Sequence, residues 1–303
     1  MVERRNIEFR ADGGAILRGW LFVPEGAAEK PHAAITMAHG YAGIKEQGIE
    51  PFAKAFADAG FVVLLHDHRG FGASDGEIRH DIDPWQQIAD WRYAISYLES
   101  LPEVDPGRIG LWGTSYAGGH AIVLGATDRR LRAVVAQVPT ISGYEQGLRR
   151  IPPEGVAGIE ALFAEDERGR ARGEPPKRQL IVSDDPAKPA AYRARDAIDF
   201  YLRHLKAIPP DIVWENSVTI RSTRAARMYE PGVWLPRVSP TPILLIVALG
   251  DTIAVADLAL AAYERALEPK RLVTIPGGHF DAYLGQFPRS SSAATEWFSE
   301  HLG

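Results

Sequence analysis

The sequence contains no cysteine among its 303 residues. Disulfide bonds, thiolate metal ligands and cysteine nucleophiles are therefore excluded, and nothing in the chain requires an oxidising compartment. Long apolar runs are also missing. The longest, at 61–65 and 242–250, are far shorter than the roughly 20 residues that a membrane-spanning helix needs. We therefore expect no membrane span.

The chain has little excess of charge of either sign. Its 34 lysine and arginine residues against 39 aspartate and glutamate residues give a formal net charge of −5. This balance does not favour a nucleic acid or an anionic membrane as partner. Residues 1–12 carry charges but no apolar stretch after them, unlike a signal peptide, so we expect a cytoplasmic protein.

Short apolar segments alternate with helix-like amphipathic segments over most of the chain. The expected strands are 16–24, 32–40, 61–70, 108–113, 131–139, 242–250 and 270–278, and the expected helices are 49–60, 83–102, 117–126, 257–267 and 292–302. Repetition of strand, helix and strand predicts an α/β fold, with a mostly parallel sheet and helices on both faces.

One long segment interrupts this alternation. Residues 141–239 are rich in arginine and proline, lack the apolar runs of buried strands, and contain one clear helical pattern at 190–208. We predict a core formed by residues 1–140 and 240–303, with 141–239 inserted as a mostly helical cap over one edge of the sheet. Its aromatic residues, Trp214 and Trp234 among them, either line an acyl pocket or form a small core of the cap.

A serine stands where a predicted strand turns into a predicted helix. Ser115 lies in the stretch GTSYAGG, between the strand at 108–113 and the helix at 117–126. This is the setting of a nucleophile elbow, a turn so tight that the residues flanking the serine must be small. Gly113 provides one small flank and Ala117 the other. Ser115 is therefore a candidate nucleophile, although a serine that caps the following helix would occupy the same position.

Two later strand ends supply the partners that such a serine needs. Asp251 follows the predicted strand 242–250, and His279 directly follows 270–278. Parallel strands deliver the residues after them to one edge of the sheet. The order Ser, Asp, His is that of a hydrolase triad, in which His279 would accept the serine proton and Asp251 would orient the imidazole. We predict Ser115, Asp251 and His279 as the catalytic residues.

A tetrahedral intermediate also needs two hydrogen-bond donors for its oxyanion. We expect one from the backbone N–H of Tyr116, directly after the serine, and one from the loop after the strand 32–40. Tyr41 N–H is the candidate there, with Ala42 as the alternative. His39 is interpreted as a structural residue whose ring holds this loop.

The loop 67–74 also carries polar residues and glycines, but it has neither the lysine of a phosphate-binding loop nor a dinucleotide-binding glycine pattern. We interpret Asp67, His68 and Arg69 as parts of the loop's architecture. The alternative is that Asp67 serves as a second acid beside His279.

These stretches together resemble the α/β-hydrolase family. The resemblance is carried by HGYAG at 39–43, DHRGFGASDG at 67–76, GTSYAGG at 113–119, Asp251 after its strand and PGGHFD at 276–281. HGYAGIKEQ is similar to the dienelactone-hydrolase-like and X-prolyl-peptidase-like branch of serine hydrolases. The resemblance implies an eight-stranded, mostly parallel sheet, a cap inserted after the sixth strand, and no cofactor.

We therefore expect a serine hydrolase that cleaves a carboxylic ester of a small molecule through an acyl-enzyme on Ser115. Hydrolysis of a thioester, lactone, amide or C–C bond, and acyl transfer to a second substrate, would use the same machinery, because bond specificity lies in the shape of the pocket. From another class, a non-catalytic small-molecule receptor on this fold is the alternative. The sequence predicts no metal site, and it leaves the oligomeric state, including a homo-oligomer, open.

Overall fold

A computed structural model describes residues 2–27, 30–204 and 208–303 of the chain. In this part of the chain, the largest element is an eight-stranded sheet with the order β1-β2-β4-β3-β5-β6-β10-β11. Its strands are β1 (Glu3–Arg10), β2 (Ile16–Val23), β3 (His32–Ala38), β4 (Val62–His66), β5 (Val104–Thr114), β6 (Leu131–Gln137), β10 (Ile243–Ala248) and β11 (Lys270–Ile275). The strands β2 and β4 pair antiparallel, as do β1 and β2, and all other pairs are parallel. The predicted mostly parallel sheet is confirmed.

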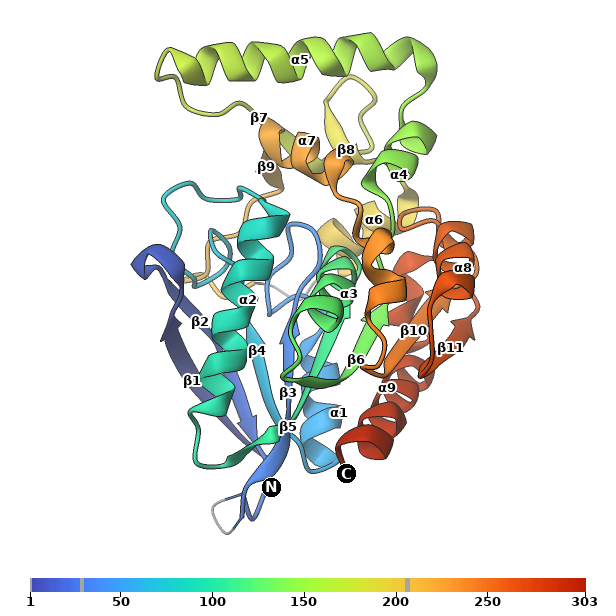
Figure 1. Cartoon of the computed structure of the whole chain (residues 1–303). Coiled ribbons are helices and arrows are strands. Elements are labelled where there is room, and N and C mark those ends of the chain that lie inside the picture. The colour runs from blue at the N-terminus through green and yellow to red at the C-terminus, as the bar shows by residue number, and fades with distance from the viewer. Residues whose placement is uncertain (1, 28–29, 205–207) are drawn as a thin grey trace.

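Helices cover both faces of this sheet (Figure 1). They are α1 (Glu50–Asp58), α2 (Pro84–Glu99), α3 (Tyr116–Thr127), α8 (Ala256–Arg265) and α9 (Phe287–Leu302). The helices α1 and α9 pack against each other, and α2 packs against α3 in front of the sheet. Because helices enclose the sheet, every residue of β4 and β10 is buried.

Local signals in the sequence account for where the core helices begin. The side chain of Asp83 accepts hydrogen bonds from the backbone N–H groups of Trp85 and Gln86, and Pro84 occupies the first helical position of α2. A capping carboxylate and a proline at this position both favour a helix start. The predicted helix at 83–102 therefore lies where the sequence places it.

The segment between β6 and β10 is mostly helical, as predicted, and it also forms a small sheet that was not predicted. It contains the helices α4 (Gly143–Arg150), α5 (Pro153–Ala171), α6 (Arg195–Ile198) and α7 (Ile220–Met228), and a second sheet with the order β8-β7-β9. The strands of this small sheet are β7 (Arg178–Val182), β8 (Ala190–Tyr192) and β9 (Ser217–Thr219). In Figure 1 the segment lies above the sheet, with the long helix α5 across its top.

The helix predicted at 190–208 is wrong in its extent. Residues 190–192 form the strand β8, α6 has only four residues, and a π-helical turn covers Asp199–His204, while 205–207 lie outside the described residues. Pairing of β8 with β7 takes the start of the segment into the small sheet. Tertiary pairing therefore overrides the local helical pattern there.

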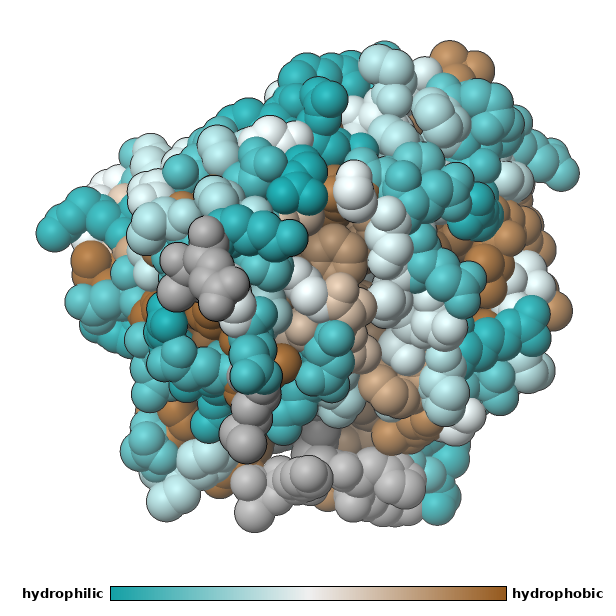
Figure 2. Space-filling model, turned by 90° about the horizontal axis from the view of Figure 1, so that it is seen from below, coloured by the Kyte–Doolittle hydropathy of each residue, from teal (hydrophilic) through white to brown (hydrophobic). Residues whose placement is uncertain are grey.

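The surface mixes hydrophilic and apolar side chains. Seen from below, hydrophilic residues cover much of the molecule and apolar residues lie interspersed among them (Figure 2). Among the described residues, no helix has the length and apolar character needed to cross a bilayer.

Candidate active site

Ser115 lies in a strained turn between β5 and α3. Its backbone dihedrals are φ 57° and ψ −119°, a region that residues with a side chain rarely adopt. The turn brings strand and helix so close that a Cβ on Gly113 would lie 2.1 Å from the carbonyl oxygen of Ala117. A side chain at Gly113 would therefore force the strand and the helix apart. Ala117 itself is fully buried, and its single methyl group is accommodated.

The structure brings the three predicted catalytic side chains into one hydrogen-bonded chain. The Nε2 of His279 lies 2.9 Å from Ser115 Oγ, and its Nδ1 lies 2.7 Å from Asp251 Oδ2. Asp251 follows β10 and His279 follows β11, so both arrive at the edge of the sheet where β5 ends. The aspartate and the histidine are 6% and 1% exposed.

Hydrogen bonds determine which atoms of Asp251 and His279 carry protons. The Oδ1 of Asp251 accepts the backbone N–H groups of Ile253 and Ala254, at 2.7 and 2.8 Å. Burial by itself raises the pKa of Asp251, but the charge of His279 and these hydrogen bonds outweigh burial and hold the pKa below its ordinary value. An ionised Asp251 only accepts, so His279 Nδ1 donates to it. Nε2 is then free to accept the proton of Ser115.

A second acid lies near the histidine. Asp196, on α6 of the inserted segment, has its Oδ2 3.0 Å from the place that a Cβ on Gly278 would occupy. Burial raises the pKa of Asp196, partly offset by its hydrogen bond from Ala197 N–H and by the charge of His279. Asp196 was not among the residues predicted from the sequence. It lies in an irregular segment, and no strand end or motif marks it.

The loop after β3 approaches the serine closely. A Cβ on Gly40 would lie 2.8 Å from Ser115 Cβ and 3.3 Å from Ser115 Oγ, so only glycine permits this approach. Within the described part of the chain, the backbone N–H groups of Tyr41, of the alternative Ala42 and of Tyr116 donate to no other protein group. An N–H group of this loop and that of Tyr116 are therefore suited to bind an oxyanion together.

Aromatic residues of the inserted segment hold this loop from outside. The hydroxyl of Tyr201 donates to the carbonyl of Tyr41 at 2.7 Å, and the indole of Trp214 donates to the carbonyl of Ala42 at 2.9 Å. The two rings stack in parallel with their centroids 6.1 Å apart. Inside the loop, His39 Nε2 donates to the carbonyl of Gln47 at 2.7 Å. Trp214 therefore fixes the loop, and the ring of His39 ties it down as interpreted from the sequence.

Removal of the Tyr201 hydroxyl is expected to slow turnover. In Tyr201→Phe the carbonyl of Tyr41 loses its hydrogen-bond donor. The loop, with the backbone N–H of Tyr41, is then held less firmly beside the serine. Complete loss of an oxyanion donor lowers the rate by about 10²–10³-fold. For a donor that is only held less firmly, we expect a decrease in kcat of about tenfold. Steady-state kinetics with a 4-nitrophenyl ester measure this, with Tyr97→Phe, whose ring stacks on Phe9, as the control. Equal kcat values for the two variants would contradict the role of Tyr201.

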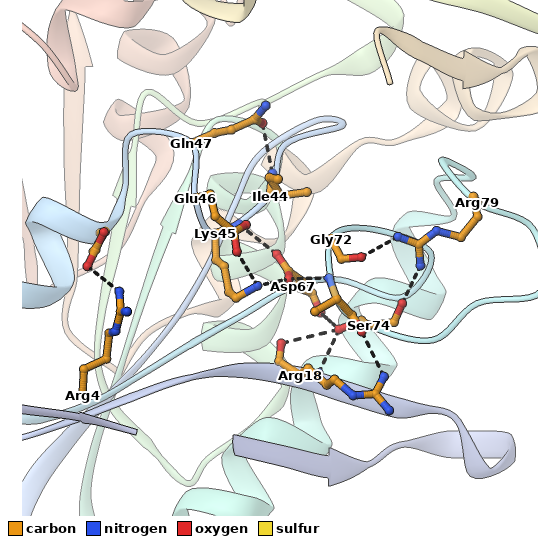
Figure 3. Close-up of polar contacts among 12 residues, drawn as sticks. Arg4, Arg18, Ile44, Lys45, Glu46, Gln47, Asp67, Gly72, Ser74 and Arg79 are labelled. Atoms are coloured by element: carbon orange, nitrogen blue, oxygen red, sulfur yellow. Dashed lines mark hydrogen bonds and ion pairs between the residues drawn. The ribbon is translucent and has the colours of Figure 1, made fainter. Parts of the chain in front are cut away.

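The carboxylate of Asp67 is occupied by the loops around it (Figure 3). It accepts from Lys45 Nζ at 2.6 Å, from the backbone N–H of Lys45 at 2.8 Å and from that of Ala73 at 3.0 Å. Ser74 Oγ donates to the Asp67 carbonyl, and Arg79 donates to the carbonyls of Gly72 and Ser74. These bonds support the architectural interpretation of Asp67 and leave no oxygen of its carboxylate free to orient His279.

Several histidines lie buried near the site. Burial lowers the pKa of His39 to about 4 and that of His68 to about 3, and it also lowers the pKa values of His66 and His120 well below their ordinary value. Over the described ranges, no group of three histidine or acidic residues is placed to hold a metal ion. These imidazoles are neutral parts of the core.

The stability of the protein is therefore expected to fall in mild acid. An unfolded histidine takes up a proton near pH 6.5, whereas folded His39 does so only near pH 4. Between these values the unfolded state binds more protons, so the free energy of unfolding decreases as the pH falls, by up to about 1.4 kcal/mol per pH unit for each such histidine. Urea unfolding at pH 7 and pH 5 measures the loss. His39→Gln should show a smaller loss than the native chain, and equal losses would contradict this assignment.

A cavity of about 510 Å³ lies next to the elbow; Tyr116 lines it, while Ser115 is not among the described residues of its lining. Residues from the elbow, the loop after β3, the loop after β10 and the inserted segment line it, including Tyr41, Tyr116, Gln146, Tyr192, Thr223 and Ile253. Trp214 and Trp234 are not among the described residues that line it. The cavity therefore lies between the sheet and the inserted segment, beside the residue that follows Ser115.

The fold and this arrangement define an α/β hydrolase, and the solved structures similar to the chain agree. Alpha/beta hydrolase GrgF from Penicillium sp. sh18 has a TM-score of 0.86 and 28% identity, over 99% of each chain. Residues 12–281 match the X-Pro dipeptidyl-peptidase (S15 family), and the chain belongs to this family. It is an esterase-like hydrolase.

Curated relatives carry several names. The quorum-quenching protein AidA of Acinetobacter baumannii is 32% identical over 83% of this chain and 81% of its own length. A thiohydrolase of Eupenicillium brefeldianum is 28% identical over 94% of this chain and 90% of its own. GrgF is also described as a polyketide transferase. The family therefore includes proteins with different named activities.

Proposed function

We propose that this protein is a serine hydrolase that cleaves a carboxylic ester of a small molecule through an acyl-enzyme on Ser115. The observation that carries the proposal is the unbroken hydrogen-bonded chain from Asp251 through His279 to Ser115 Oγ, at an elbow with positive φ. Segment 141–239 acts as the cap, since its residues supply much of the lining of the cavity beside the serine.

In the first half of the reaction, Ser115 Oγ attacks the ester carbonyl carbon while His279 Nε2 takes the hydroxyl proton. The new C–O bond places a negative charge on the carbonyl oxygen, and the N–H groups of Tyr41 and Tyr116 stabilise it. His279, now charged, is stabilised by the ionised Asp251. It then gives its proton to the departing alkoxide, the bond to the alcohol breaks, and the acyl group stays on Ser115.

In the second half, water takes the place of the alcohol. His279 removes a proton from the water as its oxygen attacks the acyl carbon, and the same N–H groups stabilise the second oxyanion. The bond to Ser115 Oγ breaks, His279 returns the proton to that oxygen, and the carboxylic acid leaves. A second substrate with a hydroxyl, amine or thiol in place of water would receive the acyl group, which makes acyl transfer the alternative outcome of the same steps.

Two relatives favour specific alternatives. A thiohydrolase and a polyketide transferase are similar to this chain over nine-tenths of its length or more. Thioester hydrolysis and acyl transfer therefore stand next to ester hydrolysis, and both pass through the same acyl-enzyme. A lactone is an internal ester and requires no further group.

Labelling by a fluorophosphonate probe tests the proposal. The probe should attach to Ser115 of the folded protein, as located by peptide mass spectrometry, and pretreatment should abolish turnover of 4-nitrophenyl esters. Rates for matched esters, thioesters and lactones would then identify the bond, and added alcohols or amines would reveal transfer. A folded protein that binds acyl compounds without labelling at Ser115 would instead be a non-catalytic receptor.

A further inference from the structure

The cavity beside Ser115 has an unequal distribution of charge. Three arginines, Arg150, Arg193 and Arg227, belong to its lining, and no aspartate, glutamate or lysine occurs among the described residues that line it. Two of these arginines are engaged by the protein. Arg150 donates to the carbonyl of Ile253 and lies over the ring of Tyr192, and Arg193 donates to carbonyls of its own loop.

Arg227 differs from the other two. It lies in the last turn of α7, with its Nη1 3.0 Å from the place of a Cβ on Gly147 of α4. Nη1 is buried and has no hydrogen-bond partner, and no described residue forms an ion pair with this guanidinium. On the same helix, Arg224 pairs with Glu167. The two arginines of this helix therefore differ, because Arg224 has an ion-pair partner and Arg227 has none among the described residues.

A second unsatisfied donor belongs to another residue of the lining, Tyr116. The side chain of Tyr116 is 4% exposed, and its hydroxyl has no hydrogen-bond partner among the described residues. Its ring packs against Tyr229 and His120, but the Tyr229 hydroxyl bonds to His120 Nδ1, and His120 Nε2 lies against Gln87. Burial raises the pKa of the Tyr116 phenol well above its ordinary value, so the phenol keeps its proton and can donate it.

A buried hydrogen-bond donor without an acceptor raises the free energy of the folded protein. A ligand that accepts a hydrogen bond from such a donor therefore binds more tightly. Two such donors, a guanidinium and a phenol, belong to residues that line this cavity, and no aspartate or glutamate is among the described residues of its lining. Arg227 also lines a second cavity together with Glu145 and Glu230, but neither glutamate forms a described ion pair with it. A guanidinium and a hydroxyl together match a carboxylate, which offers two acceptor oxygens and the opposite charge. A neutral alkyl chain would leave both donors unsatisfied.

We propose that the acyl group of the substrate carries a carboxylate away from the ester, and that Arg227 and the hydroxyl of Tyr116 bind it. The proposal rests on the serine hydrolase function proposed above. The substrate class is thus the monoester, or the corresponding thioester, of a dicarboxylic acid. Tyr116 supplies its backbone N–H to the reacting carbonyl and its side chain to the far end of the acyl group.

Two esters of equal chain length test this directly. Mono-4-nitrophenyl adipate and 4-nitrophenyl hexanoate share a six-carbon acyl chain and the leaving group, and they differ in the terminal carboxylate. We expect kcat/KM at low ionic strength to be at least about tenfold higher for the adipate ester, since hydrogen bonds to charged groups contribute about 1.5–3 kcal/mol. The preference should decrease as salt is added.

Variants test which residues cause the preference for the adipate ester. In Arg227→Met the ratio of the two kcat/KM values should approach one, and Tyr116→Phe should reduce it by about three- to tenfold. Arg224→Met removes the same charge from the same helix and should keep the native ratio. If Arg224→Met lowers the ratio as much as Arg227→Met, the effect is one of overall charge, and the assigned site is wrong.

The native protein alone can overturn the proposal. Equal or faster hydrolysis of the hexanoate ester, with Ser115 still labelled by the fluorophosphonate, would refute the carboxylate site and leave the hydrolase function standing. A binding measurement is independent of turnover. Free adipate should raise the melting temperature of the protein more than hexanoate does, and this difference should vanish in Arg227→Met. If Ser115 is not labelled but the adipate effect persists, the hydrolase function fails and the carboxylate site holds.

Discussion

Ser115→Ala is expected to lower kcat for ester hydrolysis by about 10⁶-fold, while the protein stays folded and still binds its substrate. In the proposed mechanism this hydroxyl forms the acyl-enzyme, and its oxygen is held 2.9 Å from His279 Nε2. What remains should be the contribution of binding and of the Tyr41 and Tyr116 N–H groups. Kinetics at high enzyme concentration, combined with mass spectrometry for an acyl adduct, measure the effect.

The histidine provides the matched control. His279→Ala should lower kcat about as much as Ser115→Ala does. The double variant should lower kcat no further than either single variant, because the two side chains act as one unit. Losses that multiply in the double variant would mean that the two residues act independently. Residual turnover within a hundredfold of the native rate in Ser115→Ala would remove Ser115 as the nucleophile.

Asp251→Asn is expected to lower kcat by about 10⁴-fold. An asparagine amide can keep the geometry, but when its N–H₂ group faces Nδ1 it donates there and leaves Nε2 protonated, so Nε2 no longer accepts the serine proton. The carboxylate of Asp251 now accepts three hydrogen bonds, from His279, Ile253 and Ala254. The loss should appear in kcat and much less in KM, and a 4-nitrophenyl ester assay over a range of pH measures both.

Two other acids serve as controls. Asp67→Asn should lower the free energy of unfolding, since it breaks a buried ion pair with Lys45 whose loss typically costs about 3–5 kcal/mol. Combined with Asp251→Asn, it should not lower kcat further. Asp196 lies nearer to the histidine, against Gly278. If Asp251→Asn retains more than about one hundredth of the native kcat and Asp196→Asn then removes it, Asp196 is the substitute acid and the assignment of Asp251 as the sole orienting acid is wrong.

The core of the fold follows from patterns within short stretches of chain. The apolar run at 243–248 is buried on both faces, and Asp83 with Pro84 starts α2, so element type and boundary are both local properties there. The elbow is local as well, because Gly113 and Ala117 flank Ser115 within five residues. Such stretches could be interpreted correctly from the sequence.

The elements that escaped prediction lack a clear local pattern. β1 is exposed along most of its length and carries charged residues, as an edge strand does, so it shows no apolar alternation. The 19-residue helix α5 buries only Phe163, Asp166 and Gly169 and therefore has no apolar stripe. β8 takes its conformation from pairing with β7, which no pattern within 190–208 records.

Local patterns alone predicted that Ser115, Asp251 and His279 lie together, because a tight turn demands small neighbours and parallel strands end at one edge. Only the folded chain decided what surrounds them. The bonds from Tyr201 to Tyr41 and from Trp214 to Ala42 join residues 160 and 172 positions apart. Arg227 and Tyr116, each with a donor that lacks an acceptor, line one cavity formed by separate segments. Contacts of that range depend on how the inserted segment packs on the sheet, which no short stretch of sequence encodes.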